Sequence, residues 1–251
     1  MRTQAIVALI CMGLCVPAIR AGEPPRPFEI AIEAGPVWQA DNDVQIPNDD
    51  SGDRFSLAEV TGNGPWTSLR FEFLWDIRPR HGLRVLVAPL SITEDGALDD
   101  TVRFAGETFD PDSPVEATYQ FDSWRATYRY RVKDGPQWRW WIGATLKVRD
   151  ARIRLEQGNT VGEDTDVGVV PLLYLRGEWR FADRWNLLLD FDGLAGGPGR
   201  AFDVSAQVRR AVGDRWTVGG GYRTLEGGAD VEDVYSFAWF HYAVVSAAVR
   251  F

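Results

Sequence analysis

The chain has 251 residues and a formal net charge of −9. This length suits one or two domains, and β-barrels of this size commonly form a single one. The excess of acidic over basic residues argues against nucleic acid or another polyanion as a partner. Both cysteines, Cys11 and Cys15, lie near the N-terminus, so the rest of the chain offers no disulfide or thiol chemistry.

Residues 1–21, MRTQAIVALICMGLCVPAIRA, are expected to be a secretory signal peptide. Arg2 supplies a positive start, residues 5–16 form a short apolar stretch, and Ala18 or Ala21 offers a cleavage site. The apolar stretch is too short to cross a bilayer as a helix, and no later apolar run approaches the required length of about 18 residues. We therefore expect an exported chain whose residues 22–251 form one domain.

After residue 25, apolar and polar side chains alternate with a period of two. In TSLRFEFLWDI, for example, Leu69, Phe71 and Phe73 share one face, while Arg70 and Glu72 share the other. Such alternation is typical of β-strands with two different faces. A soluble sandwich buries the apolar face, whereas a membrane barrel turns it to lipid. Alternation alone does not choose between them.

Short turns and longer polar segments alternate between the expected strands. Turns are expected at 78–82, 133–137, 182–184 and 213–215, and loops at about 41–65, 94–117, 156–166, 195–201 and 226–234. Short turns at one end and long loops at the other are typical of outer-membrane barrels. They separate ten strands, near 27–40, 66–77, 83–93, 118–132, 138–155, 167–181, 185–194, 202–212, 216–225 and 235–251. Eight strands would result if two weak strands merge into loops, and twelve if RFSLAEV and TVRFAGETF form their own hairpins.

Aromatic residues gather at both ends of these strands. Beside the short turns lie Trp75, Tyr130, Trp138, Trp179, Phe181, Trp185 and Trp216, joined by Phe28 and Phe251. Toward the loops lie Trp38, Trp66, Tyr119, Phe202, Tyr222 and Trp239. Two such girdles indicate rings at the two membrane–water interfaces.

The chain ends in HYAVVSAAVRF, and Phe251, Val249, Ala247 and Val245 share one face of this last strand. Together with the signal peptide and the alternating strands, this tail resembles small outer-membrane β-barrel proteins of Gram-negative bacteria. In that class, a C-terminal strand ending in Phe is the signal recognised by the barrel assembly machinery. The resemblance implies an all-β, ten-stranded antiparallel up-and-down transmembrane barrel. It also implies a place in the cell outer membrane, in contact with outer-membrane lipid and lipopolysaccharide.

Charge is divided unevenly between the loops and the strands. The five loops hold 22 acidic and three basic residues, which leaves 14 acidic and 22 basic residues in the remainder of 22–251. Acidic loops can attract divalent cations, which also bridge lipopolysaccharide phosphates. The first loop, DNDVQIPNDDSGD, lacks the spacing of an EF-hand, so no specific metal site is expected.

The inward faces of the expected barrel carry both charge signs. The basic residues are Arg70, Arg125, Arg129, Arg149, Arg176 and Arg223, and the acidic ones are Glu33, Glu72, Glu178, Asp190 and Asp192. Unpaired charge in a narrow lumen is costly, so these groups should pair or stay hydrated. Eight strands leave an interior that side chains nearly fill, so ten strands predict a plugged or very narrow lumen. A narrow channel for ions or small solutes is the alternative.

Two histidines limit the scope for catalysis. His81 lies in a turn, and His241 lies near the outer end of the last strand. Lipid A deacylases use a Ser-His-acid set, but Ala243 stands where a His-x-Ser motif would have its serine. An omptin-like pairing of His241 with Asp230 or Asp233 stays open. We expect a structural or surface-interaction role without enzymatic activity or cofactor. A lipid- or peptide-hydrolysing enzyme and a soluble periplasmic β-protein are the alternatives.

Overall fold

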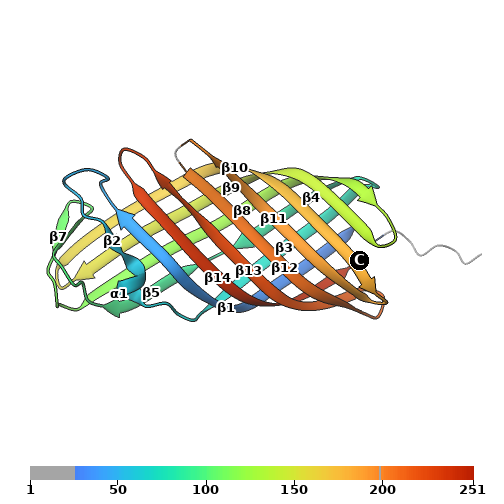
Figure 1. The fold of residues 1–251 in the computed structure, drawn as a ribbon, viewed down its shortest axis with the longest axis horizontal. Helices are drawn as coiled ribbons and strands as arrows, with labels where there is room; N and C mark the ends of the chain where they lie inside the picture. The colour runs from blue at the N-terminus through green and yellow to red at the C-terminus, as the bar shows by residue number, and fades with distance from the viewer. Residues whose placement is uncertain (1–25, 198) are drawn as a thin grey trace, which may run out of the picture.

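The structure is a computed structural model that describes residues 26–197 and 199–251, so the predicted signal peptide lies outside the described residues. Figure 1 shows an elongated barrel of long, tilted strands. Its wall strands are β1 (Phe28–Gln45), β3 (Trp66–Arg78), β4 (His81–Ala88), β5 (Ser91–Gly96), β8 (Val115–Asp134), β9 (Trp138–Gln157), β10 (Thr160–Ala182), β11 (Trp185–Gly196), β12 (Gly199–Val212), β13 (Trp216–Asp230) and β14 (Tyr235–Arg250). Among the described residues, no helix is long and apolar enough to cross a membrane.

The barrel is closed by its first and last strands. β1 pairs antiparallel with β3 on one side and with β14 on the other, with Ala34 opposite Val245 across the closure. Since β4 and β5 follow one another along β8, the described wall has the ten antiparallel strands that the sequence predicts. The twelve-strand alternative is wrong for the wall. TVRFAGETF does form a hairpin, β6 (Val102–Phe104) with β7 (Glu107–Phe109), but the hairpin pairs only with itself.

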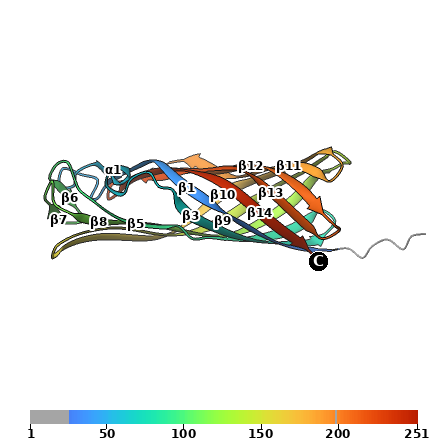
Figure 2. The ribbon, with the colours of Figure 1, turned by 90° about the horizontal axis from the view of Figure 1, so that it is seen from below.

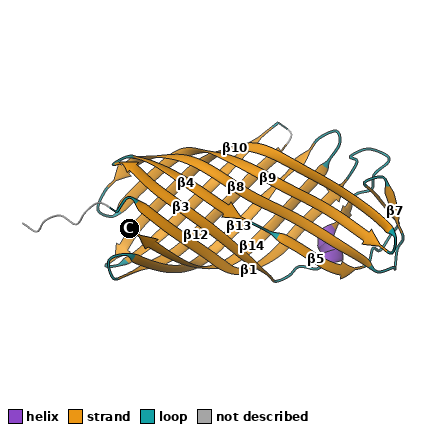
Figure 3. Ribbon diagram, turned by 180° about the vertical axis from the view of Figure 1, so that it is seen from behind, coloured by secondary structure: helices purple, strands orange, loops and turns teal. Residues whose placement is uncertain are grey.

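The strand predicted at 83–93 is divided at Pro89. Proline has no N–H and interrupts a ladder of backbone hydrogen bonds. The backbone N–H of Leu90 donates instead to Oδ1 of Asp122 at 3.1 Å. The carbonyl of Leu90 accepts from the N–H of Phe121 at 2.8 Å. β3 therefore pairs with β4 but not with β5, and helix α1 (Leu57–Thr61) packs beside β5 (Figure 3).

Three of the five loops predicted from the sequence are shorter in the structure than predicted, because the strands beside them are longer. β9 and β10 are separated by only 158–159, β11 and β12 by 197–198, and β13 and β14 by 231–234. β10 has 23 residues, whereas about 9–11 residues of a tilted strand cross a membrane. The polar residues at these positions mark the point where the wall leaves the lipid, and strand pairing continues beyond it.

The two faces of the wall exchange polarity along the barrel. On β9, Leu146 faces outward with 59% of its surface exposed, and its neighbour Lys147 faces inward with 2% exposed. Farther along, Leu155 is buried inside, while Arg152 and Arg154 are partly exposed outside. An apolar outer face matches lipid, and a polar outer face matches water. The outer lipid boundary therefore crosses β9 between Leu146 and Arg152.

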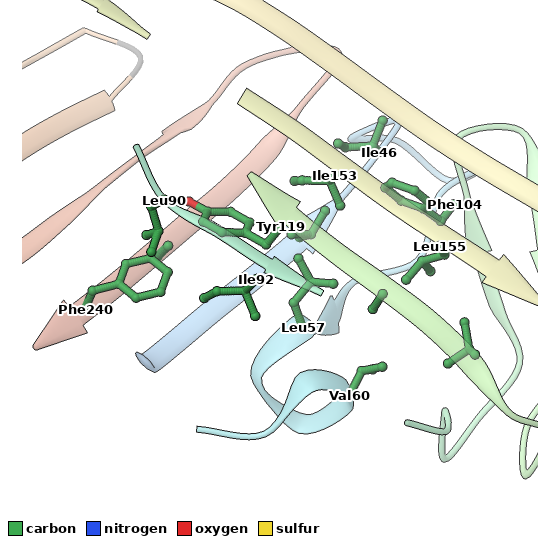
Figure 4. Close-up of a cluster of buried hydrophobic side chains, with 14 of the residues drawn as sticks. Ile46, Leu57, Val60, Leu90, Ile92, Phe104, Tyr119, Ile153, Leu155 and Phe240 are labelled. Carbon is green, nitrogen blue, oxygen red and sulfur yellow. The ribbon is translucent and has the colours of Figure 1, made fainter. Parts of the chain in front are cut away.

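Beyond this boundary the barrel contains an apolar core, which we call the outer cap (Figure 4). Its buried residues include Val37, Ile46, Leu57, Val60, Leu90, Ile92, Phe104, Phe109, Tyr119, Ile153, Leu155 and Phe240. Helix α1 and the β6–β7 hairpin contribute to it from the end of the barrel that lies opposite the C-terminus (Figure 2). The two long connections thus fold back against the barrel end and pack into this apolar core.

The aromatic rings beside the short turns pack against each other. Trp138 stacks with Trp140 and with Trp179, each at a centroid distance of 5.5 Å. Toward the loops, Tyr119 was predicted to belong to the aromatic girdle at the membrane–water interface, but it is 5% exposed and belongs to the outer cap. Trp124, absent from the predicted girdle, is 43% exposed on the outer face instead. Both residues are aromatic, so residue type could not show that Tyr119 points inward and Trp124 outward. Tyr119 lies on the part of β8 where the apolar face of the strand is the inner one.

Candidate functional site

Two aspartates organise the centre of the lumen. Asp203 on β12 accepts from Nη2 of Arg70 at 3.0 Å, lies 2.8 Å from Nη2 of Arg125 and is also bonded by Arg223. Oδ2 of Asp192 on β11 accepts from Nη1 of Arg125 at 2.9 Å and also from Nη2 of Arg84. Both carboxylates are almost completely buried. Arg125 on β8 therefore bridges β11 and β12, two strands to which β8 is not paired.

This cluster continues toward the short turns. Nη1 of Arg176 donates to Glu72 at 3.0 Å. Nε of Arg176 lies 3.5 Å from Glu178, which also accepts from Nη2 of Arg209 at 3.1 Å. On the opposite wall, Nη2 of Arg223 donates to Glu33 at 2.9 Å. The result is one continuous set of ion pairs, which we call the lumen network, along the membrane-spanning part of the barrel.

Nine of the eleven predicted lumen residues lie in the lumen network. They are Glu33, Arg70, Glu72, Arg125, Arg176, Glu178, Asp190, Asp192 and Arg223. The other two lie elsewhere. Arg129 pairs with Asp76 at 2.5 Å near the β3–β4 turn, and Arg149 pairs with Asp166 toward the outer end.

Sequence reasoning missed Arg84, Asp203, Arg209 and Glu29, which are all buried inside. The signal was available, since Arg84 alternates with Leu83 and Val85 on a strand with an apolar outer face. A lumen lysine, Lys147, was also missed. No carboxylate lies within 4 Å of it in the described parts of the chain, and its Nζ lies 4.4 Å from the ring centroid of Phe121. A cation over a ring face is partly stabilised by the ring quadrupole.

Burial explains why the lumen network is so completely paired. A buried charge without a partner costs several kcal/mol, and ion pairs offset this only with good geometry and further hydrogen bonds. Neutral partners supply some of these bonds: Thr145 donates to Asp192 at 2.7 Å, and Gln207 to Glu33 at 2.8 Å. The arrangement holds fixed charges of both signs in place inside the barrel.

Neither histidine lies in the lumen. His241 stacks on Tyr222 on the outer face, and its Nδ1 shares a hydrogen bond with the Tyr222 hydroxyl. Within residues 26–197 and 199–251, no carboxylate comes within 4 Å of His241, and Asp230 accepts from Asn48 at 2.9 Å. Nδ1 of His81 shares a hydrogen bond of 2.6 Å with the hydroxyl of Tyr128. The same residues contain no cluster of three or more His, Cys, Asp or Glu that could hold a metal ion.

The C-terminal strand lies at the closure of the barrel. Phe251 exchanges two backbone hydrogen bonds with Phe28, at 2.9 and 3.1 Å, and the two rings lie 5.8 Å apart. Val249, Ala247 and Val245 follow on the same outward face, and Val245 is highly exposed. This face is apolar and turned toward lipid.

No known protein family matches the sequence, and no curated protein matches it. The outer-membrane protease OmpT from Escherichia coli shares the fold with a TM-score of 0.55 and 9% identity, over 91% of this chain and 98% of that one. Neisserial surface protein A gives a TM-score of 0.40 at 13% identity over 89% and 97%, and Ail of Yersinia pestis gives 0.37 at 9% over 90% and 99%. The predicted resemblance to Gram-negative outer-membrane barrels is confirmed for the fold.

Proposed function

We propose that this outer-membrane barrel is a non-enzymatic, non-conducting anchor that holds a compact acidic structure at the cell surface. The observation that carries the proposal is that two different barriers follow one another along the lumen. The lumen network crosses the interior of the membrane-spanning part, and the apolar outer cap packs the interior beyond it. A channel needs a continuous water-filled path through the barrel, and each of these two barriers alone would interrupt such a path.

The two barriers oppose permeation for different physical reasons. In the lumen network, an ion must separate buried partners such as Arg125 and Asp203, which costs about 3–5 kcal/mol for each broken pair. In the outer cap, a hydrated ion meets buried Phe240 and Leu155 and must lose its water without any polar replacement. Removal of one barrier should therefore leave the other intact.

Conductance measurements test the proposal. Purified protein in planar bilayers should give no steady unitary current, and neither Phe240→Ala nor Arg125→Ala should open it. The combined variant should conduct, because both barriers are then weakened. A steady wild-type current that is lost or altered in Arg125→Ala or Arg176→Ala would refute the proposal and favour a narrow channel.

The absence of enzymatic activity belongs to the same proposal. It is supported by the outward position of His241 and its bond to Tyr222. His241→Ala should leave lipid A profiles and surface proteolysis unchanged relative to wild type, at equal surface abundance. A loss of either activity in this variant would contradict the proposal and favour a hydrolase at the outer surface.

The outer rim suggests the partners of the anchor. Acidic side chains dominate the outer segments, while Arg152 and Arg154 project from the wall just above the lipid boundary. We expect divalent cations to gather at the carboxylates and lipopolysaccharide to surround the rim. We also expect the barrel assembly machinery to recognise the tail that ends at Phe251. Magnesium binding to the purified barrel that disappears at high monovalent salt would support diffuse attraction rather than a built site.

A further inference from the structure

A hollow of about 430 Å³ lies at the turn end of the barrel, on the side opposite the outer cap. We call it the inner vestibule. Six arginines line it: Arg139, Arg180, Arg184, Arg209, Arg215 and Arg250. The acidic residues of its wall are Glu29, Asp183 and Asp214. Six positive charges against three negative ones leave an excess of three positive charges on the wall.

The arginines of the vestibule form two groups. The inner three are already paired, since Arg139 and Arg209 bind Glu178 and Arg250 binds Glu29. The outer three, Arg180, Arg184 and Arg215, are exposed, and no carboxylate in the described residues lies within 4 Å of them. Their guanidinium groups are therefore available to a ligand.

The backbone beneath the outer arginines is held in place. The carbonyl of Arg184 accepts from the N–H of Ala211 at 2.8 Å, and that of Arg215 accepts from the N–H of Arg250 at 2.9 Å. The N–H of Arg180 donates to the carbonyl of Gln137 at 2.8 Å. Three guanidinium groups from separate elements thus surround one hollow, and a pre-organised wall lowers the cost of ordering on binding.

We propose that the inner vestibule binds a compact polyvalent phosphate anion from the periplasmic side. Guanidinium groups match phosphate oxygens with two parallel hydrogen bonds, and several of them together favour a ligand with more than one negative charge. The volume lies in the range of small-molecule sites, about 300–1,000 Å³. The uneven charge distribution fits this assignment, because the acidic outer end of the same barrel repels such anions.

Calorimetric titration of the full barrel in a nonionic detergent tests the proposal, with inorganic pyrophosphate as the probe. Pyrophosphate should bind more tightly than acetate or citrate, and affinity should fall with salt. The triple variant Arg180→Gln, Arg184→Gln, Arg215→Gln should lose about tenfold in affinity for each guanidinium removed. Glycerol phosphate as a second probe distinguishes an esterified from a free phosphate, and binding of either one supports the site.

A matched control removes the same charge from the same end of the barrel. Arg78 and Arg80 lie at the β3–β4 turn, and Arg210 lies outside the wall over the ring of Trp185, at 5.5 Å. The triple variant Arg78→Gln, Arg80→Gln, Arg210→Gln should keep the wild-type affinity. Equal losses in both triple variants, or citrate binding as tightly as pyrophosphate, would overturn the proposal. Heat-dependent gel mobility should show that both variants are closed barrels, and conductance plays no part in this test.

Discussion

Replacement of Asp203 by Asn is the sharpest test of the lumen network. The change keeps the shape of the side chain and removes the charge that Arg70, Arg125 and Arg223 share. At about 3 Å and an effective dielectric constant of about 20, each contact has a gross attraction of about 5 kcal/mol. The net loss is smaller because Arg125 keeps Asp192 at 2.9 Å and Arg223 keeps Glu33 at 2.9 Å.

We therefore expect Asp203→Asn to lower the free energy of unfolding by about 3–5 kcal/mol, the usual cost of breaking a buried ion pair. The assay is urea unfolding in detergent micelles, followed by the mobility difference between folded and unfolded barrel on unheated gels. Ser205→Ala is the control two residues along the same strand. The Ser205 hydroxyl is buried without a hydrogen-bond partner, so its removal should be nearly neutral. A loss below about 1 kcal/mol for Asp203→Asn would refute the reasoning.

Three further predictions concern other parts of the barrel. Hydrogen bonds from the side chain and backbone of Arg103 lower the pKa of Asp53 to about 2. The stability that this contact gives to the β6–β7 hairpin should therefore be fully present above pH about 4 and lost as the pH falls toward 2. In Arg103→Gln, an NMR titration should find the pKa of Asp53 closer to its ordinary value, and an unchanged pKa would contradict this assignment. Gly143→Ala should destabilise the wall in the same urea assay, because the new Cβ would lie 2.1 Å from the carbonyl oxygen of Tyr128, whereas Gly196→Ala meets nothing within 4 Å and should be neutral. Phe251→Ala should slow insertion into proteoliposomes that contain the assembly machinery, while Phe73→Ala on β3 should insert at the wild-type rate. Equal rates for all three proteins would exclude a role of Phe251 in recognition.

The sequence by itself determined the architecture and the faces of the strands. Side chains alternate between the two faces of a strand. Leu69 and Phe71 are apolar and Arg70 is charged, so the sequence alone assigned the first two to lipid and Arg70 to the lumen. The short turns and the aromatic rings then indicated which end of each strand was which. These signals are local, and each needs only a few consecutive residues to be read.

Only the tertiary structure decided which charges meet. Arg70 and Asp203 are separated by 133 positions in the chain, and Arg84 and Asp190 by 106. The alternation along a strand shows that a side chain points into the lumen. Its height along the barrel axis, however, depends on the stagger of all ten strands, and its partner depends on which strands pair to close the wall. The exchange of polarity beyond the lipid escaped sequence reasoning for a related reason. The inside of the barrel changes from charged to apolar only where α1 and the β6–β7 hairpin fold into its mouth, and these contacts are long-range.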